Sequence, residues 1–398
     1  MVGKAPSGKG KWPGGGRTGI RMGSEREIDR DGLGGRIAGL PGFEDVRAAA
    51  TAAGIEAFLV GGAVRDALLG QERADLDVVV AGDHLALARA LGEAIRAYDR
   101  FRTATVTAGH GTVDIARARA ESYPYPGALP EVRPAGIDED LSRRDFSVNA
   151  MAVPLTAPGE LIDPHRGLED LRRGLLRALH ERSLADDPTR ALRAARYAAR
   201  LGLEPEPATL EQIRRADLTA VSADRVEAER RKLAAEPEPA PGFELLDRWG
   251  LIELAPSAAE LIGEIVELAR REPWNREIRD RDGAVLAAAA GEIERPRAVA
   301  AIRPARRSEG VAAAQGLSQA ELLVARALGA EWLDDYVAAD RHLRLAISGQ
   351  DLVEAGIEPG PAIGRGLDEA LRALLDGEVT TRADQLAAAL RAARQTAP

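Results

Sequence analysis

The pattern of apolar residues changes near Leu141, and this change limits the chain to a fold with at least two kinds of parts. Before it, short apolar strands alternate with helices, whereas the later sequence is typical of helices almost throughout. A mixed α/β segment followed by an all-α segment indicates separate domains. The length of 398 residues agrees, since single cores rarely grow beyond about 250–300 residues. We therefore predict an α+β fold, in which a small mixed sheet with helices is followed by all-α parts.

Turn residues mark the ends of the helices and strands expected in the first part. Asp83 is a plausible N-cap for the third helix, and the Tyr-Pro-Tyr-Pro-Gly stretch at 123–127 predicts a loop. Helices are expected over 43–53, 64–69 and 84–97, and strands over 56–60, 76–80, 103–107 and 112–115.

Composition excludes several classes of protein. The chain has no cysteine, which excludes disulfides and thiolate zinc sites. No apolar run approaches the ~20 residues of a membrane span, and the first 40 residues lack the apolar core of a secretory signal. We therefore predict a cytoplasmic protein with no membrane partner, and the sequence indicates no obligate protein partner. Residues 1–35 are rich in glycine and basic residues and predict a disordered tail.

Gly61 and Gly62 follow a short apolar strand and precede a helix. Two glycines let the backbone turn tightly and approach a phosphate, toward which the amides of the helix start would point. Arg65 lies in the first turn of that helix and can donate to phosphate oxygens. Most Gly-Gly pairs are ordinary turns, so this feature gains weight only from its neighbours.

Three aspartates provide the ligands that a magnesium site needs. Asp75 and Asp77 are two residues apart at the start of a strand, which places both carboxylates on one face. Asp114 lies on another strand among Val113 and Ile115, where a carboxylate needs a partner or a metal. Mg²⁺ binds hard oxygen ligands together with phosphates, and three carboxylates fit a two-metal site. The alternative is a solvated strand edge, which a lone Asp-x-Asp usually is.

Taken together, these motifs resemble the signature of class II tRNA nucleotidyltransferases and bacterial poly(A) polymerases, within the polymerase β superfamily. The resemblance is strong over roughly residues 40–240 and weaker beyond. It is carried by residues 59–80, by RRDFSVNAMA at 143–152, by Ile-Asp-Pro at 162–164, and by DDPTRALRAARY at 186–197.

This resemblance implies a function and a role for each matching residue. It implies transfer of nucleotides from CTP and ATP to the 3′ end of tRNA, with Mg²⁺ as the cofactor. Residues 123–134 match a flexible loop that helps to complete the active site. Asp75, Asp77 and Asp114 would be catalytic and bind the metal. The nucleotide would be bound by Gly62, Arg65, Arg144, Asp187, Arg190, Arg193 and Arg196.

The net charge of −9 hides a local basic stripe. Asp187 and Pro188 begin a helix, on which arginines follow at spacings of three, three and four residues: Arg190, Arg193, Arg196 and Arg200. Such a stripe can bind phosphates on an acidic protein, although runs of charge are more often a solvated helix face.

The chemistry of base selection can be argued from two residues of this helix. Cytosine and adenine each present a ring-nitrogen acceptor beside an exocyclic amino donor. The donors of Arg190 and the acceptor of Asp187 match that order, whereas uracil and guanine present it reversed. The resemblance assigns this role to the same positions. One departure is Asp186, where the family usually has glutamate.

The sequence therefore predicts a disordered tail at 1–35, a nucleotidyltransferase head at 36–175, a helical neck at 176–240, and a tRNA-binding helical body and tail at 241–398. The predicted activity is CCA addition. Alternatives within the same chemistry are a CC-only or A-only enzyme and a poly(A) polymerase. A non-catalytic RNA-binding protein on this scaffold is an alternative from another class.

Overall fold

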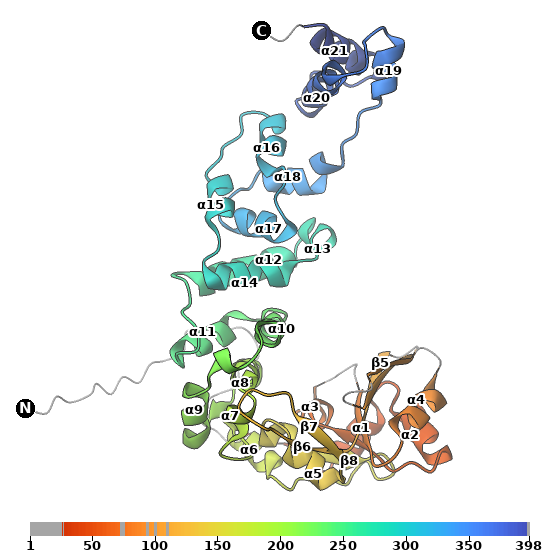
Figure 1. Ribbon diagram of the computed structural model, residues 1–398, viewed down its shortest axis with the longest axis vertical. Coiled ribbons are helices and arrows are strands. Elements are labelled where there is room, and N and C mark those ends of the chain that lie inside the picture. The colour runs from red at the N-terminus through yellow and green to blue at the C-terminus, as the bar shows by residue number, and fades with distance from the viewer. Residues whose placement is uncertain are drawn as a thin grey trace, which may run out of the picture. The chain divides into compact units, whose positions relative to one another are not determined.

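The structure is a computed structural model that describes residues 26, 28–71, 76–92, 95–98, 102–108 and 111–395. The chain divides into two compact units, one ending at Val221 and the other beginning at Ser222. The first unit contains strands and helices, and the second is helical throughout its described part (Figure 1). The α+β class is therefore confirmed. The predicted boundaries at 175 and 240 stay predictions.

The first unit is built around a six-stranded mixed sheet. Its elements are α1 (Leu33–Ala38), α2 (Phe43–Ala52), β1 (Ala57–Val60), α3 (Gly62–Leu68), β2 (Leu76–Val80), α4 (His84–Leu91), β3 (Ile95–Tyr98), β4 (Thr103–Ala108), β5 (Gly111–Arg117), β6 (Arg119–Ser122), β7 (Glu131–Pro134), α5 (Ile137–Ser142), η2 (Ser147–Asn149), β8 (Ala152–Pro154), α6 (Gly167–Arg173), β9 (Leu175–Leu176), α7 (Ser183–Asp186), α8 (Thr189–Leu201), β10 (Glu204–Pro205), α9 (Pro207–Arg214) and η3 (Leu218–Ala220).

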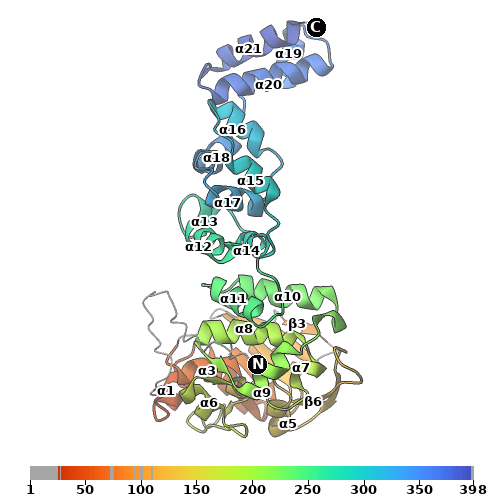
Figure 2. The same cartoon turned by 90° about the vertical axis from the view of Figure 1, so that its left-hand side faces the viewer.

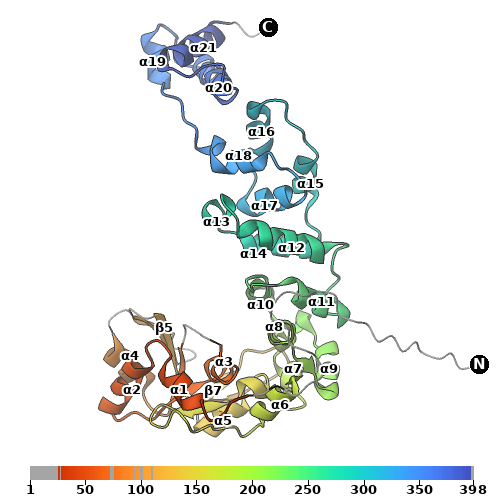
Figure 3. The ribbon, with the colours of Figure 1, turned by 180° about the vertical axis from the view of Figure 1, so that it is seen from behind.

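The order of the sheet is β3-β4-β5-β2-β1-β8. Only β2 and β5 pair in parallel; the other neighbouring strands are antiparallel. Helix α4 packs against β4 and β5, and α2 packs against α4 (Figures 1 and 3). Phe58, Val60 and Val79 of the sheet form a core cluster with Leu141 of α5, which anchors the end of α5 to the sheet.

The helix predicted over 84–97 is too long. Asp83 caps α4 as expected, by accepting the N–H of Leu85. The helix then ends at Leu91, and Ile95–Tyr98 form the edge strand β3, which pairs with β4. The Ala- and Leu-rich sequence favours helix locally, but Gly92 provides a natural end to the helix, and pairing with β4 overrides the local preference of the residues that follow.

Most of the predicted disordered tail lies outside the described residues, which begin with Arg26 and continue from Ile28. Within the last part of that predicted segment, Ile28 and Leu33 are buried, and helix α1 begins at Leu33. The chain is therefore packed before the predicted boundary at residue 35, where two apolar side chains are buried and Arg26 donates to the carbonyl of Gly202 at 2.7 Å.

The motif at 162–164 has a structural role. Both carboxylate oxygens of Asp163 accept amide N–H groups from the start of α6, those of Gly167 and Leu168. Gly167 lies so close to the chain at Ser147 that an added Cβ would be 2.2 Å from the carbonyl oxygen of Ser147. Helix α6 is thereby fixed against the RRDFSVNAMA motif.

The second unit consists of helices. In its last part, α20 and α21 lie side by side, with α19 packed against both (Figure 2). No described helix is both long enough and apolar enough to cross a membrane. The elements are α10 (Ala223–Ala234), α11 (Ala240–Arg248), α12 (Ala258–Ala269), α13 (Trp274–Glu277), α14 (Arg281–Ala290), α15 (Glu294–Ala300), α16 (Arg307–Ala314), α17 (Gln319–Ala327), α18 (Leu333–Ala338), η4 (Asp340–His342), α19 (Gly349–Glu354), α20 (Pro361–Leu375) and α21 (Arg382–Arg394).

We expect Gly167→Ala to lower the free energy of unfolding by about 1–3 kcal/mol, because the new methyl group overlaps backbone atoms that cannot move aside. Urea denaturation of the full chain measures this change. The matched control is Gly35→Ala in α1, where an added Cβ meets nothing within 4 Å. This control should be neutral or stabilising by up to about 1 kcal/mol, and equal effects of the two changes would contradict the packing argument.

Candidate functional site

The turn that is predicted to bind phosphate and two of the predicted carboxylates lie at the same end of neighbouring strands. In the antiparallel pair of β1 and β2, Leu59 is opposite Val78, so the end of β1 lies beside the start of β2. Gly61 therefore follows β1 near Asp77, the second residue of β2. In the parallel pair of β2 and β5, Asp77 is directly opposite Asp114. Strand pairing alone thus brings the turn and both aspartates together.

Asp114 is exposed, which corrects the reason given for its importance. Val113 and Ile115 are buried because side chains alternate along β5, so they face away from Asp114. The hydroxyl of Thr105 on β4 donates to Asp114 Oδ1 at 2.6 Å. Asp75 lies outside the described residues. Within the described residues, no group of three His, Cys, Asp or Glu side chains is placed to hold a metal. Asp77 and Asp114 nevertheless place two carboxylates on neighbouring strands, and carboxylate oxygens are the kind of ligand that Mg²⁺ prefers.

Gly61 is favoured at the turn by its backbone conformation, and it leaves room for the end of a flexible arginine side chain. Its φ of 64° and ψ of −125° lie where residues with a Cβ are strained. An added Cβ would also be 2.8 Å from Nη1 of Arg144. The Arg144 Nη2 donates to Asp140 at 2.9 Å, but its buried Nε has no acceptor within the described part of the chain. Because buried donors are almost always paired, this arginine at the turn is suited to an anionic ligand.

Arg65 of α3 is 1% exposed, so its guanidinium depends on partners from the protein. Its Nε and Nη2 donate to Asp66 Oδ1 at 2.8 and 2.6 Å, and its Nη1 donates to the side-chain oxygen of Asn149. Asp66 also pairs with Arg200 of α8 at 3.3 Å. The guanidinium of Arg65, which is predicted to contact phosphate, thus lies beneath the surface and already donates to Asp66 and Asn149.

Asp145 connects the second motif to α8. It accepts a hydrogen bond from Asn149 at 3.0 Å and another from Arg193 Nε at 2.8 Å. Burial alone would raise the pKa of Asp145, but the charge of Arg193, the hydrogen bond from Asn149 and the charge of Arg190 outweigh it. These partners hold the pKa well below its usual value, so the carboxylate stays charged.

Tyr197 closes a ring of contacts. Arg193 Nη2 donates to the Tyr197 hydroxyl at 3.1 Å, and the guanidinium carbon of Arg65 lies 5.4 Å from the centroid of its ring. The ring of contacts therefore runs from Arg65 through Asn149, Asp145, Arg193 and Tyr197 back to Arg65. Three of the predicted nucleotide-binding arginines surround this tyrosine, since Arg196 lies 4.6 Å from the same centroid.

Asp187 and Arg190 are placed differently from one another. Asp187 Oδ1 accepts from the backbone N–H of Thr189 at 3.1 Å and from its hydroxyl at 2.6 Å, so Asp187 caps the start of α8. Arg190 is 6% exposed. Its guanidinium donates to the carbonyls of Arg144 at 3.1 Å and Arg143 at 2.7 Å, and to the hydroxyl of Ser183 at 2.7 Å. The arginine stripe is therefore not a solvated face at this position.

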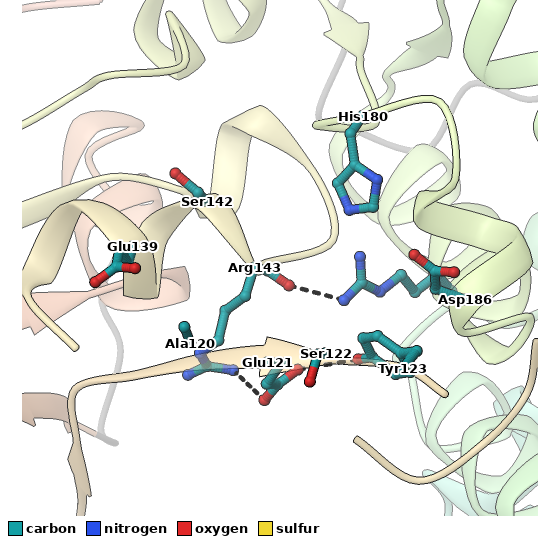
Figure 4. A pocket seen from close by; sticks show the side chains of 10 residues that line it. Ala120, Glu121, Ser122, Tyr123, Glu139, Ser142, Arg143, His180 and Asp186 are labelled. Carbon is teal, nitrogen blue, oxygen red and sulfur yellow. Dashed lines mark hydrogen bonds and ion pairs between the residues drawn. The ribbon is translucent and has the colours of Figure 1, made fainter. Parts of the chain in front are cut away.

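A cavity of about 280 Å³ opens beside Arg190 (Figure 4). Glu121 forms its floor, accepting from the Tyr123 hydroxyl and from Arg143, both at 2.9 Å. Burial, and then the charge of Glu121, raise the pKa of Tyr123 far above its usual value. His180 points into the cavity, and burial followed by the charge of Arg190 lowers its pKa. Both effects favour the neutral imidazole.

The predicted loop is tied to the neck at the same place. The N–H of Gly127 donates to the carbonyl of Asp186 at 3.1 Å. Gly127 has a φ of 76°, and an added Cβ would be 2.3 Å from the carbonyl oxygen of Ala220. The loop that follows β6 is thereby held next to the residue that precedes Asp187.

Sequence reasoning missed several residues of this site: Asp66, Thr105, Glu121, Asp145, Asn149 and Tyr197. Asp145 and Asn149 were visible as an acid and an amide four residues apart within RRDFSVNAMA. A requirement that every buried arginine have acceptors would have pointed to them. Nothing in the sequence marks Thr105, because its importance comes only from strand pairing.

Comparisons with known proteins show which proteins this chain is similar to. The Poly A polymerase head domain matches residues 57–177. The chain is 40% identical over 355 residues to the CC-adding tRNA nucleotidyltransferase of Deinococcus radiodurans, covering 85% of this chain and 89% of that protein. It is 44% identical over 203 residues to the A-adding tRNA nucleotidyltransferase of Halalkalibacterium halodurans, covering 48% of each. The structure of the Thermotoga maritima CCA-adding enzyme complexed with tRNA superposes with a TM-score of 0.64 and 25% identity, covering 92% of this chain and 99% of that one.

We expect Asp145→Asn to lower the free energy of unfolding by about 1–3 kcal/mol at pH 7, because Arg193 loses a charged acceptor. A carboxyl group whose pKa is lower in the folded than in the unfolded state stabilises the fold at pH values above its unfolded pKa. That stabilisation is lost as the pH falls through its folded pKa. The difference in the free energy of unfolding between Asp145→Asn and wild type should therefore be largest near neutral pH, and it should become smaller below about pH 4. Urea titrations between pH 7 and pH 3.5 measure it. The exposed Asp138→Asn is the control, and a difference that stays constant with pH would contradict the ion pair.

Proposed function

The chain belongs to the tRNA nucleotidyltransferase family, and we propose that it adds CMP and AMP from CTP and ATP to the 3′ end of tRNA without a nucleic-acid template. The observation that carries the proposal is that Gly61, Asp77 and Asp114 lie together at the same end of neighbouring strands. A turn that can bind phosphate beside paired carboxylates is suited to the transfer of a nucleotidyl group.

The proposed reaction joins one nucleotide at a time. The 3′-hydroxyl oxygen of tRNA attacks the α-phosphorus of the nucleotide, a new O–P bond forms, and the bond to the bridging oxygen of the β-phosphate breaks. Pyrophosphate leaves, and the hydroxyl proton passes to solvent. Mg²⁺ held by Asp75, Asp77 and Asp114 would supply positive charge at the reacting phosphate. The residues of the chain orient the two substrates, so no covalent intermediate with the protein is needed.

Exposure ranks the arginines proposed to hold the triphosphate. The side chains of Arg144 and Arg193 are 17% and 30% exposed, and Arg196 is half-buried. We assign direct phosphate contacts to these three, together with the backbone at Gly62. We assign no direct phosphate contact to Arg65, which lies beneath these three arginines, because its donors are already used by Asp66 and Asn149.

The base is proposed to be selected by Asp187 and Arg190. In this structure Arg190 donates to three protein acceptors. If Arg190 donates to cytosine N3 or adenine N1, it exchanges one of these hydrogen bonds for a hydrogen bond to the base. The free-energy cost of binding the base therefore stays low. Asp187 would accept from the exocyclic amine while it still caps α8. Asp186, which stands where the family has glutamate, pairs with Arg182 at 3.1 Å.

A second candidate is addition of CC only. It is favoured by the 40% identity to a CC-adding enzyme across 89% of that enzyme's length, whereas the match to an A-adding enzyme covers 48% of that protein. Both candidates use the same residues for phosphate and metal, and they differ in whether ATP is accepted after the second cytidine.

Incorporation assays on three tRNA transcripts, ending before CCA, after C and after CC, test the proposal. We expect label from CTP on the first two and label from ATP on the third. Failure on the third alone identifies a CC-only enzyme. ATP incorporation on all three indicates poly(A) synthesis. No incorporation on any would leave a non-catalytic RNA-binding protein.

Asp77→Ala provides the inactive control for these assays. Loss of a metal ligand should lower the rate by orders of magnitude while leaving the fold intact, and Asp75→Ala should behave alike. The matched control is Asp83→Asn, because asparagine caps a helix about as well as aspartate. Near-wild-type incorporation by Asp77→Ala at saturating Mg²⁺ would remove the metal site from the proposal.

Base selection predicts that Asp187→Asn relaxes discrimination against UTP and GTP by roughly tenfold to a hundredfold, from about 1–3 kcal/mol per unpaired polar group. The asparagine amide can turn its NH₂ toward uracil O4 or guanine O6, yet it still caps α8. Arg190→Ala should weaken CTP and ATP use relative to UTP and GTP. Single-nucleotide incorporation with each of the four nucleotides measures both. Unchanged ratios in Asp187→Asn would reduce its role to the cap.

A further inference from the structure

We propose that Tyr197 is a positioning residue that holds Arg65, Arg193 and Arg196 together as one preassembled site for the triphosphate. This inference rests on the proposed function, since it specifies how the same site is kept ready for its nucleotide. Tyr197 is the last residue of the motif at 186–197, but no role was predicted for it, and it lies at the centre of three arginines for which one was.

The geometry is unusual because three like charges share one ring. The guanidinium carbons of Arg65, Arg193 and Arg196 lie 5.4, 5.6 and 4.6 Å from the centroid of Tyr197. All three distances are within the range of cation–π attraction. Arg65 comes from α3 and the other two from α8, so the ring joins the head motif to the neck helix.

The ring adds to what carboxylates already do in this cluster. Arg65 pairs with Asp66, and Arg193 pairs with Asp145, so carboxylates offset part of the charge of two of the three arginines. The face of a ring attracts a guanidinium without cancelling its charge. Tyr197 can therefore hold the three arginines close together without a further anion that a phosphate would have to displace.

The hydroxyl adds direction to this attraction. Arg193 Nη2 and Arg196 Nη2 approach the Tyr197 oxygen at 3.1 and 3.4 Å. Arg193 is four residues before Tyr197 on α8, so the two side chains share a face of the helix. The hydroxyl thus orients the plane of each guanidinium, which decides where its remaining donors point.

Tyr197 is itself held in place. It is 8% exposed, and its ring meets Phe146 edge to face, with centroids 6.1 Å apart and planes at 83°. Phe146 follows Asp145, which binds Arg193. The ring therefore cannot turn away from the cluster without breaking contacts with the second motif, and the arginines are ordered before the nucleotide arrives.

The test compares Tyr197→Phe, which keeps the ring, with Tyr197→Leu, which removes it. Pyrophosphate is the probe, because it occupies the phosphate subsite and has no base. We expect its inhibition constant and the KM for CTP to rise together, by about threefold to tenfold in Tyr197→Phe and by more in Tyr197→Leu. The KM for tRNA and the CTP:UTP preference should stay unchanged. Tyr336→Phe, in the second unit, is the control and should match wild type.

Two outcomes would overturn the inference. One is wild-type pyrophosphate inhibition in both variants. The other is a KM for tRNA that rises as much as the KM for CTP, which would indicate a general loss of structure. If Tyr197→Leu melts earlier than wild type, the Tyr197→Phe result decides. Equilibrium dialysis with pyrophosphate separates this inference from the proposed function. If wild type binds pyrophosphate more tightly than the Tyr197 variants but adds no nucleotide to tRNA, the proposed function is contradicted and this inference is not.

Discussion

Burial of the Arg65 guanidinium constrains the whole first unit. A buried guanidinium is costly unless its donors are bonded, and Arg65 finds its acceptors in Asp66 beside it and in Asn149 of the distant RRDFSVNAMA motif. Asn149 presents its oxygen to Arg65 because its nitrogen donates to Asp145. Asp145 in turn is charged because Arg193 of α8 pairs with it. Each polar group is acceptable only because the next one is present, so the head and α8 are specified together.

The sequence predicted the parts that depend on local pattern. The strand containing Asp77 and the strand containing Asp114 could both be located from runs of β-branched residues. Their parallel pairing, which places the two carboxylates opposite each other, could not, because register depends on packing across the sheet. In the same way, the position of Arg144 at Gly61 could not be derived from spacing, since no local rule brings residues so distant in sequence together. The resemblance implied only that Arg144 contacts the nucleotide.

The predicted end of the helix over 84–97 was wrong, and it shows the limit of local propensity. Residues 84–97 are rich in alanine and leucine and favour helix at nearly every position. The chain leaves the helix at Gly92 because residues 95–98 gain backbone hydrogen bonds at the edge of the sheet. Tyr197 was missed for a related reason: its sequence context is that of an ordinary apolar helix position, and its importance comes from Arg65, which belongs to another helix.

Arg190 connects the two ends of the proposed nucleotide site through hydrogen bonds to the backbone. Its guanidinium donates to the carbonyls of Arg143 and Arg144, while the side chains of those two residues converge on the buried Asp140. Burial opposes the charge of Asp140, but the charges of Arg144 and Arg143 outweigh it and lower its pKa. Arg144 is also the residue that lies against the Gly61 turn. In the proposed mechanism, a base that engages Arg190 competes with the carbonyl of Arg144, the residue assigned to the phosphates, so that selection of the base and binding of the triphosphate would depend on the same short segment.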